Sequence, residues 1–279
     1  MDALRLETRI SIVIVSYNRP REVQETVRSL FNQSVKPFEI LVIDDGSDPP
    51  LKMAVDFPDF KLIRFDKEQG LSNSRNFGIN AAKGEYVAFL DDDTVPSQHW
   101  LEAVQNGISS GADVMGGPLR PLYKARPPSW WTEKDFGYMA GVGNIYGQRI
   151  WGANMIFKKN VFNKIGFFDS RLGRKKGKLM SCEEDKLIKK ARLCCHYLFL
   201  PEAEVLHLVP SRRMTLNYII RWNYYEGKST RILNGRRTIK TLYDILMIGK
   251  NMLNPFLMFN KSARIKQIAE MVSKFSLLL

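Results

Sequence analysis

Val87-Ala88-Phe89-Leu90-Asp91-Asp92-Asp93 is the most informative stretch of this chain of 279 residues. Its apolar part predicts a buried strand, and three carboxylates follow directly at the strand's end. Adjacent carboxylates repel one another, and a divalent cation held by their oxygens relieves that repulsion. The same residues also suit an acidic turn that caps a helix beginning near Pro96. The stretch alone leaves both interpretations open.

Short apolar runs alternate with helical patterns on both sides of this stretch, which indicates a mostly parallel sheet flanked by helices. Residues 118–150 are rich in Pro, Trp and Gly and predict a long irregular loop, and residues 173–178 predict a mobile basic loop. We expect one α/β domain over residues 1–210 and a helical extension over residues 211–279. Strands are predicted over residues 10–16, 38–44, 61–65, 86–91, 152–158 and 204–208, and helices over residues 20–32, 71–82 and 184–194 and from about residue 215.

Charge is concentrated near the carboxyl terminus. Thirteen Lys or Arg stand against three Asp or Glu from Leu206 to Leu279, which supplies +10 of the chain's net charge of +13. Short apolar runs, such as residues 255–259, are interspersed among these charges and fit helices lying on an anionic membrane surface. They equally fit helices that pack on the main domain with basic outer faces. The basic excess lies away from any nucleic-acid-binding motif, so no nucleic-acid partner is expected.

The amino terminus lacks the apolar run of a secretory signal, and no stretch reaches the roughly eighteen apolar residues that a membrane span requires. We therefore expect a cytoplasmic protein, peripheral at most on the inner face of the plasma membrane. The three cysteines, Cys182, Cys194 and Cys195, follow no metal or disulfide spacing and are interpreted as free thiols.

Polar residues follow two further predicted strands. The first strand ends at Ser16-Tyr17-Asn18-Arg19 and the second at Asp44-Asp45-Gly46. Ligands bind at the carboxyl ends of strands in open α/β sheets, where an acidic side chain can accept hydrogen bonds from a nucleoside. No Gly-x-Gly-x-x-Gly follows the first strand, so a metal on the three aspartates would have to hold the phosphates. Asp-Gly alone is also a common turn.

Taken together, Val15-Ser16-Tyr17-Asn18-Arg19, Ile43-Asp44-Asp45-Gly46-Ser47-Asp48 and Phe89-Leu90-Asp91-Asp92-Asp93 resemble, in order and spacing, the inverting family 2 glycosyltransferases. The resemblance covers residues 10–210 and implies the Rossmann-like GT-A fold. It implies that Tyr17 and Asp45 contact the nucleoside, that Asp91 faces the ribose and base, and that Asp93 binds Mg²⁺ or Mn²⁺. The nucleotide-binding set that it implies is Ser16, Tyr17, Asn18, Arg19, Asp45, Arg75, Asp91 and Asp92.

Cys182-Glu183-Glu184-Asp185 resembles the Glu-Asp motif of the same family. The resemblance implies that Asp185 is the base that deprotonates the acceptor hydroxyl, while Glu184 orients it or binds acceptor. A carboxylate within hydrogen-bond reach can take this proton as the new bond forms. Acidic residues at a helix start also complement the helix dipole without any catalytic role.

His207 and a segment around Trp151 also match the family. His207 falls where a second metal ligand is often found, and imidazole favours Mn²⁺ over Mg²⁺. Lone histidines at strand ends are more often only hydrogen-bonded. The segment that matches the donor-sugar and acceptor positions is Trp151-Gly152-Ala153-Asn154, which would otherwise be a buried strand with a packing tryptophan.

Tyr218-Ile219-Ile220-Arg221-Trp222 departs from the Gln-x-x-Arg-Trp motif of processive members, because the Gln is absent. The departure favours addition of a single sugar, with Arg221 reaching the diphosphate. The resemblance therefore implies an inverting, metal-dependent glycosyltransferase that moves a sugar from a nucleotide donor, with UDP as the expected carrier, to a glycan or lipid-linked glycan. Such a reaction belongs to polysaccharide or glycolipid biosynthesis. The alternatives are an inactive adaptor of the same fold on a membrane surface and a sugar nucleotidyltransferase.

Overall fold

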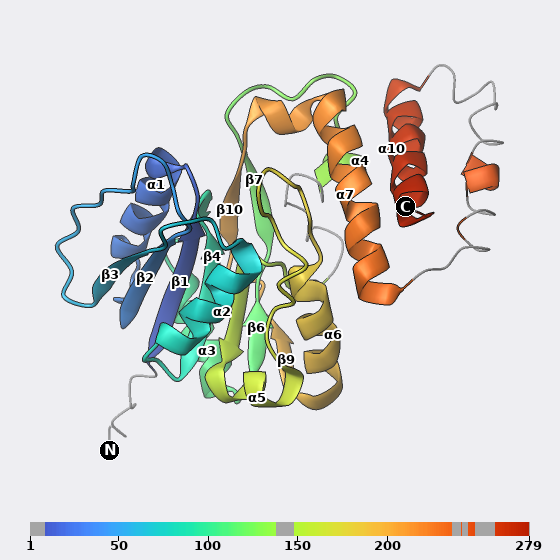
Figure 1. The fold of residues 1–279 in the computed structure, drawn as a ribbon. Coiled ribbons are helices and arrows are strands. Elements are labelled where there is room, and N and C mark those ends of the chain that lie inside the picture. Colours follow the sequence, from blue (N-terminus) through green and yellow to red (C-terminus); the bar gives the residue numbers. More distant parts are fainter. Residues whose placement is uncertain (1–8, 138–147, 236–240, 242–244, 249–259, 279) are drawn as a thin grey trace.

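A seven-stranded mixed sheet forms the centre of the molecule (Figure 1). The structure is a computed structural model and describes residues 9–137, 148–235, 241, 245–248 and 260–278. The strand order is β3-β2-β1-β4-β8-β6-β9. Strand β8 is antiparallel to both of its neighbours, and the other pairs are parallel. The mostly parallel sheet is therefore confirmed. The strands are β1 (Ile10–Ser16), β2 (Glu39–Asp44), β3 (Phe60–Arg64), β4 (Tyr86–Asp91), β6 (Val114–Gly116), β8 (Asn154–Lys158) and β9 (Tyr197–Phe199).

Helices cover both faces of this sheet (Figure 1). Side chains alternate along β1, so Ile12 and Ile14 pack into one core while Val13 packs into the other. The first core contains α1 and α3, and the second contains α2, α5 and α6. Burial on both faces explains why the central strands are almost wholly apolar. The helices are α1 (Pro20–Phe31), α2 (Leu71–Ala81), α3 (Trp100–Ser109), α5 (Phe162–Ile165) and α6 (Glu183–Cys194).

A second, three-stranded sheet corrects the prediction of an irregular loop after residue 117. Strand β10 (Val205–Val209) lies between β5 (Thr94–Pro96) and β7 (Leu119–Tyr123). The β7 segment carries a Pro and an exposed Arg in five residues, so its sequence lacks a strand-like apolar pattern. Residues 138–147 of that predicted loop lie outside the described residues. Pairing of His207 with Thr94 brings β10 beside the end of the aspartate run.

The carboxyl-terminal helices have a core of their own. Helix α7 (Leu216–Asn234) begins at Thr215, whose hydroxyl accepts a hydrogen bond from the Tyr218 N–H. It packs against α10 (Lys261–Leu278), and Phe136 of the short α4 (Glu133–Phe136) belongs to the same hydrophobic core. Within the described residues, no helix is both long and apolar enough to cross a bilayer. The apolar run at residues 255–259 lies outside the described part of the chain.

Candidate active site

Two carboxylates and one imidazole meet at the carboxyl end of β4. The ligand atoms of Asp91, Asp93 and His207 all lie within 4.8 Å of one another. His207 Nε2 is 3.1 Å from Asp93 Oδ1 and 4.0 Å from Asp91 Oδ2. The pairing of β5 with β10 creates this proximity, because the backbone N–H of Leu208 donates to the carbonyl of Asp93 over 2.8 Å.

This cluster fits a divalent cation. Asp93 Oδ1 is buried and accepts no hydrogen bond within the described residues; it faces His207 Nε2 instead. A buried carboxylate oxygen without a partner is costly, and a cation placed among the three ligand atoms would satisfy it. Two carboxylates and one imidazole form a ligand set that suits Mn²⁺ better than Mg²⁺.

Two arginines hold the other oxygen of Asp93 in place. Arg19 Nη1 and Arg213 Nη2 each lie 2.9 Å from Asp93 Oδ2. Burial opposes ionisation, but His207, Arg213 and Arg19 outweigh it, so the pKa of Asp93 falls well below its usual range. Asp93 is therefore an anion at neutral pH, as a metal ligand must be.

Asp92 has a different environment from its neighbour. It accepts hydrogen bonds from Ser16 Oγ at 2.7 Å and Arg19 Nη1 at 2.8 Å. Burial raises the pKa of Asp92 to about 6, against the lowering effect of Arg19. Ser16 and Asp92 thus bind each other and join β1 to β4 beneath the metal cluster.

A cavity of about 280 Å³, here called the basic cavity, lies on one side of the cluster. Tyr17 and Asp45, which the resemblance assigns to the nucleoside, both line it. The carboxylate of Asp45 accepts hydrogen bonds from the backbone N–H groups of Gln69 and Gly70, at 2.8 and 2.9 Å. The charged side chains in the lining are Arg19, Arg174, Lys175, Lys178 and Arg213 together with Asp45, Glu68, Asp91 and Asp92.

Asn18 supports the loop after β1 and does not line the basic cavity. Its φ of 56° places it in the left-handed region, which asparagine tolerates better than most residues. Its backbone N–H donates to Ser47 Oγ over 2.9 Å, and its side-chain oxygen accepts from the Asp48 N–H over 2.8 Å. These bonds join the ends of β1 and β2.

Arg174 is the cation of the basic cavity that pattern reasoning missed. Its guanidinium lies 3.5 Å from the Tyr218 hydroxyl and forms no ion pair within the described residues. Burial opposes the shift, but Arg174 lowers the pKa of Tyr218. Arg221, predicted to reach the diphosphate, donates instead to the carbonyl of Gly177 over 3.4 Å and lines neither cavity.

A second cavity of about 140 Å³, here called the acidic cavity, lies on the other side of the cluster. Asp91, Arg174 and His207 line both cavities. The charged side chains in its lining are Asp91, Glu183, Glu184, Asp185 and Glu226 together with Arg75, Arg149 and Arg174.

Arg75 connects the metal cluster to α6. Its two terminal nitrogens lie 2.9 Å from Asp91 Oδ1 and 2.9 Å from Glu183 Oε1, and one also donates to the carbonyl of Gly152 over 3.1 Å. The guanidinium is almost fully buried, with 3% of its side chain exposed. Arg75 therefore holds Asp91 and the start of α6 at a fixed separation.

Glu184 and Asp185 both line the acidic cavity but differ in their surroundings. Asp185 is 31% exposed and accepts a 2.6 Å hydrogen bond from Arg149. Glu184 is buried, and burial, with Glu183 and Asp185, raises its pKa to about 8. Cys182, just before the triplet, has a φ of 64°, a strained conformation of the kind that gathers at functional sites.

The predicted sugar segment is divided between cavity and core. Trp151, Gly152 and Ala153 line the acidic cavity. Asn154 does not, because its side-chain oxygen accepts from Trp100 Nε1 over 2.9 Å and its nitrogen donates to the carbonyl of Ala203 over 2.8 Å. Its position fits a role in the core, so the structure does not bring Asn154 to the sugar-binding surface.

Helix α7 completes the acidic cavity. Trp222 and Glu226 lie four residues apart, on one face of the helix, and both line the cavity. Glu226 accepts hydrogen bonds from Ser181 Oγ and, over 3.4 Å, from Cys182 Sγ. One feature of the sequence could have indicated Glu226: it is an acidic residue one helical turn after Trp222, the last residue of the segment that resembles the Gln-x-x-Arg-Trp motif. The helix is thus part of the site as well as of the extension.

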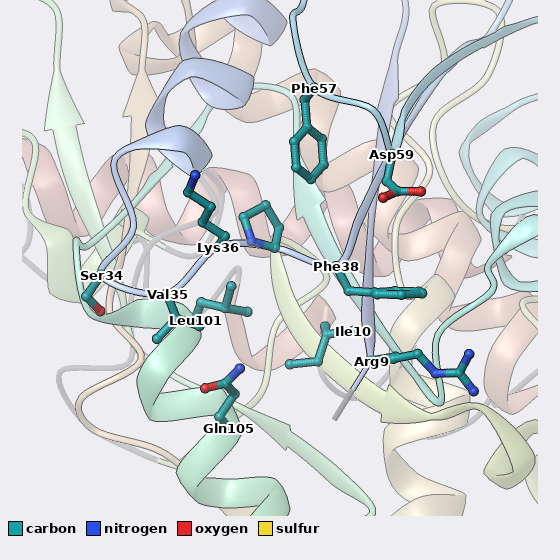
Figure 2. A pocket seen from close by; sticks show the side chains of 11 residues that line it. Arg9, Ile10, Ser34, Val35, Lys36, Phe38, Phe57, Asp59, Leu101 and Gln105 are labelled. Atoms are coloured by element: carbon teal, nitrogen blue, oxygen red, sulfur yellow. The ribbon is translucent and has the colours of Figure 1, made fainter. Parts of the chain in front are cut away.

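A larger hollow, of about 820 Å³, lies elsewhere in the molecule (Figure 2). Arg9, Ile10 and Phe38 line it at the amino ends of β1 and β2, opposite the edge at which α/β sheets bind ligands. It contains no cluster of metal-ligating side chains within the described residues. Size alone therefore does not identify the active site.

The fold and the cluster at the strand ends define an α/β nucleotide-sugar-binding protein of the GT-A type. The model of glycosyl transferase family 2 matches residues 11–176, and the chain belongs to this family. The protein is therefore an enzyme that transfers a sugar from a nucleotide-sugar.

Three known proteins illustrate the similarity. The glucosyl-dolichyl phosphate glucuronosyltransferase of Haloferax volcanii is 25% identical over 248 residues, covering 81% of this chain and 77% of the relative. The succinoglycan biosynthesis protein ExoM of Rhizobium meliloti is 27% identical over 235 residues, covering 79% and 73%. A mannosyltransferase from Pyrobaculum calidifontis, solved with GDP-Man and Mn²⁺, has a TM-score of 0.55 at 15% identity, covering 97% and 72%.

Proposed function

We propose that this enzyme transfers one sugar, with inversion, from a nucleoside diphosphate donor to an acceptor hydroxyl in a divalent-cation-dependent reaction. The observation that carries the proposal is the cluster of Asp91, Asp93 and His207, whose ligand atoms all lie within 4.8 Å of one another. Two of its members, Asp91 and His207, line both cavities. Asp91, Asp93 and His207 would hold the cation. A bound Mn²⁺ would offset the negative charge that develops on the leaving diphosphate.

The basic cavity would hold the nucleotide. Tyr17 offers an exposed ring for the base, and Asp45 offers acceptor oxygens. Arg174 and Arg213 supply positive charge for the diphosphate, and Arg174 has no carboxylate partner to release first among the described residues. UDP remains the expected carrier from the family resemblance, and GDP is the second candidate because the P. calidifontis neighbour was solved with GDP-Man.

The acidic cavity would hold the sugar and the acceptor hydroxyl. The acceptor oxygen forms a bond to the anomeric carbon, the bond from that carbon to the diphosphate breaks, and a carboxylate takes the acceptor proton. Asp185 is the base that the resemblance implies. The geometry favours Glu184, because Asp185 is neutralised by Arg149 while burial makes Glu184 more basic.

The acceptor would be a lipid-linked or polysaccharide glycan. The names of the H. volcanii and R. meliloti relatives, a dolichyl phosphate glucuronosyltransferase and a succinoglycan biosynthesis protein, support this proposal. The basic α10 and the exposed side chain of Phe275 would suit an anionic membrane surface. Cosedimentation with vesicles containing anionic phospholipid, but not with neutral vesicles, is expected; equal recovery with both would contradict membrane docking.

The test of the metal site is calorimetric titration of UDP and of GDP with and without MnCl₂. For the nucleotide that binds, Mn²⁺ should tighten binding at least tenfold in the wild type, and Asp93→Asn should remove that gain. Asp56→Asn, an exposed aspartate on the connection between β2 and β3, is the matched control. Binding that ignores Mn²⁺ in the wild type would contradict the proposal.

A further inference from the structure

The first residues of α6 follow a strained backbone. Cys182, which directly precedes the helix, has a φ of 64°, and its thiol makes no capping hydrogen bond to the first turn among the described residues. A residue with a side chain keeps this left-handed conformation only where its surroundings hold it. Glu184 and Asp185, the two candidates for the base, are the second and third residues of the helix. Their placement therefore depends on what holds Cys182.

Helix α7 makes the contacts that hold this segment. Glu226 accepts hydrogen bonds from Ser181 Oγ and, over 3.4 Å, from Cys182 Sγ. Three residues further along α7, the hydroxyl oxygen of Ser229 accepts a hydrogen bond from the backbone N–H of Ser181 over 3.0 Å, and Ser229 is fully buried. Residues three apart lie on the same side of a helix. One face of α7 therefore binds both Cys182 and the residue before it.

A different face of α7 lies against α10 (Figure 1). A side chain at Gly227 would collide with α10, because its Cβ would lie 1.7 Å from Ser276 Oγ and 2.1 Å from the carbonyl oxygen of Ser273. Glycine allows this close approach of the two backbones. Helix α7 is thus packed between α10 and the segment that leads into α6, which leaves it little room to move away from Ser181.

We propose that Glu226 and Ser229 are positioning residues for the transfer reaction. By holding Ser181 and Cys182 they place the start of α6, so that one of its carboxylates can take the proton of the acceptor hydroxyl. The inference rests on the proposed function, since it assumes that Glu184 or Asp185 is the base. It makes the carboxyl-terminal helices part of catalysis, because a displacement of about 1 Å at a reacting group can cost a factor of about 100 in rate.

Kinetics of Glu226→Ala test the inference. The reaction is release of UDP or GDP from a panel of UDP-linked and GDP-linked hexoses with MnCl₂, with water as the acceptor. The kcat should fall by about 100-fold. Affinity and stoichiometry for UDP or GDP should not change in calorimetry, because the nucleotide is proposed to bind in the basic cavity. Unchanged stoichiometry also shows that the whole sample is folded, which separates misplacement of the base from partial unfolding.

Two further variants complete this experiment. Glu226→Gln keeps an acceptor for the Ser181 hydroxyl and should recover most of the lost kcat. Glu270→Ala removes an exposed glutamate on α10 and, as the matched control, should keep the wild-type kcat. A fully folded Glu226→Ala with wild-type kcat, or a Glu226→Gln as slow as Glu226→Ala, would overturn the role of Glu226.

Ser229→Ala tests the second contact and decides the outcome if Glu226→Ala loses nucleotide stoichiometry. It removes one acceptor of a backbone hydrogen bond and should lower kcat by about tenfold. A wild-type kcat in this variant would overturn the inference. The proposed base is tested separately: if neither Glu184→Gln nor Asp185→Asn lowers kcat, or if the wild type releases nucleotide from no donor, the proposed function is contradicted and the inference with it.

Discussion

The basic and acidic cavities share Asp91 and His207 of the metal cluster but differ in their other charged side chains. Five basic and four acidic side chains line the basic cavity, against three basic and five acidic in the other. The first balance suits a diphosphate, and the second suits hydroxyl groups and a proton acceptor. The comparison teaches that two electrostatic environments meet at Asp91 and His207, the two metal-cluster residues that line both cavities. Each substitution below acts on one side of this division.

The largest expected effect is on the acidic side, at Glu184. Glu184→Gln should lower kcat by about 10³-fold, within the usual range for loss of a general base. Donor affinity should change little, because the amide preserves the shape of the side chain. Asp185→Asn should lower kcat by only about tenfold, since Asp185 mainly holds Arg149. Steady-state kinetics measure both values of kcat. A larger decrease in kcat for Asp185→Asn than for Glu184→Gln would identify Asp185 as the base.

A smaller effect is expected on the basic side, at Arg174. Arg174→Ala should weaken UDP or GDP binding by roughly 10–100-fold, as expected for loss of a charged hydrogen bond. Binding of the free nucleoside should not change, because it lacks the diphosphate. Arg221→Ala is the matched control, because that guanidinium lines neither cavity. Titration with nucleoside and with nucleotide distinguishes loss of a diphosphate contact from loss of a nucleoside contact. A larger loss of nucleotide affinity in Arg221→Ala than in Arg174→Ala would favour Arg221, the residue predicted from the sequence.

The smallest effect is on stability. The folded protein holds the pKa of Glu184 at about 8, well above the value of a free glutamate, so the native state keeps a proton that the unfolded chain has lost. The contribution of Glu184 to the free energy of unfolding therefore decreases as pH rises from about 4.5 to about 8. Glu184→Gln should gain about 1–3 kcal/mol at pH 8 relative to wild type and little at pH 4.5. Thermal unfolding of both proteins across this pH range measures the difference in stability. A difference that does not change with pH would exclude the raised pKa of Glu184.

Much of the fold was predictable, because its signals are local. Strands β1 and β4 agree with their predicted bounds, and α1, α2 and α6 agree within one residue, since apolar runs and Pro20 mark them. Strand β7 was missed, because it gains its order from pairing with β10 and not from its own pattern.

The family motifs predicted that Asp93 and His207 share a metal, and the fold does bring these two side chains together. Asp91, predicted to face the ribose and base, lies in the same cluster. Arg174, Tyr218 and Glu226 were not assigned roles, because nothing in their local sequence says that a loop and a helix converge on one site. Arg221 and Asn154 show the converse limit. Each matches a motif by spacing, yet its side chain is engaged elsewhere by Gly177 or by Trp100 and Ala203.

The most direct test of the central claim is anomalous diffraction from crystals grown with MnCl₂ and UDP or GDP. The account predicts a manganese peak among Asp91, Asp93 and His207, with the diphosphate on the Arg174 side and the acidic cavity left for the sugar. A manganese ion bound elsewhere with the nucleotide, or a diphosphate lying among Glu183, Glu184 and Glu226, would contradict it.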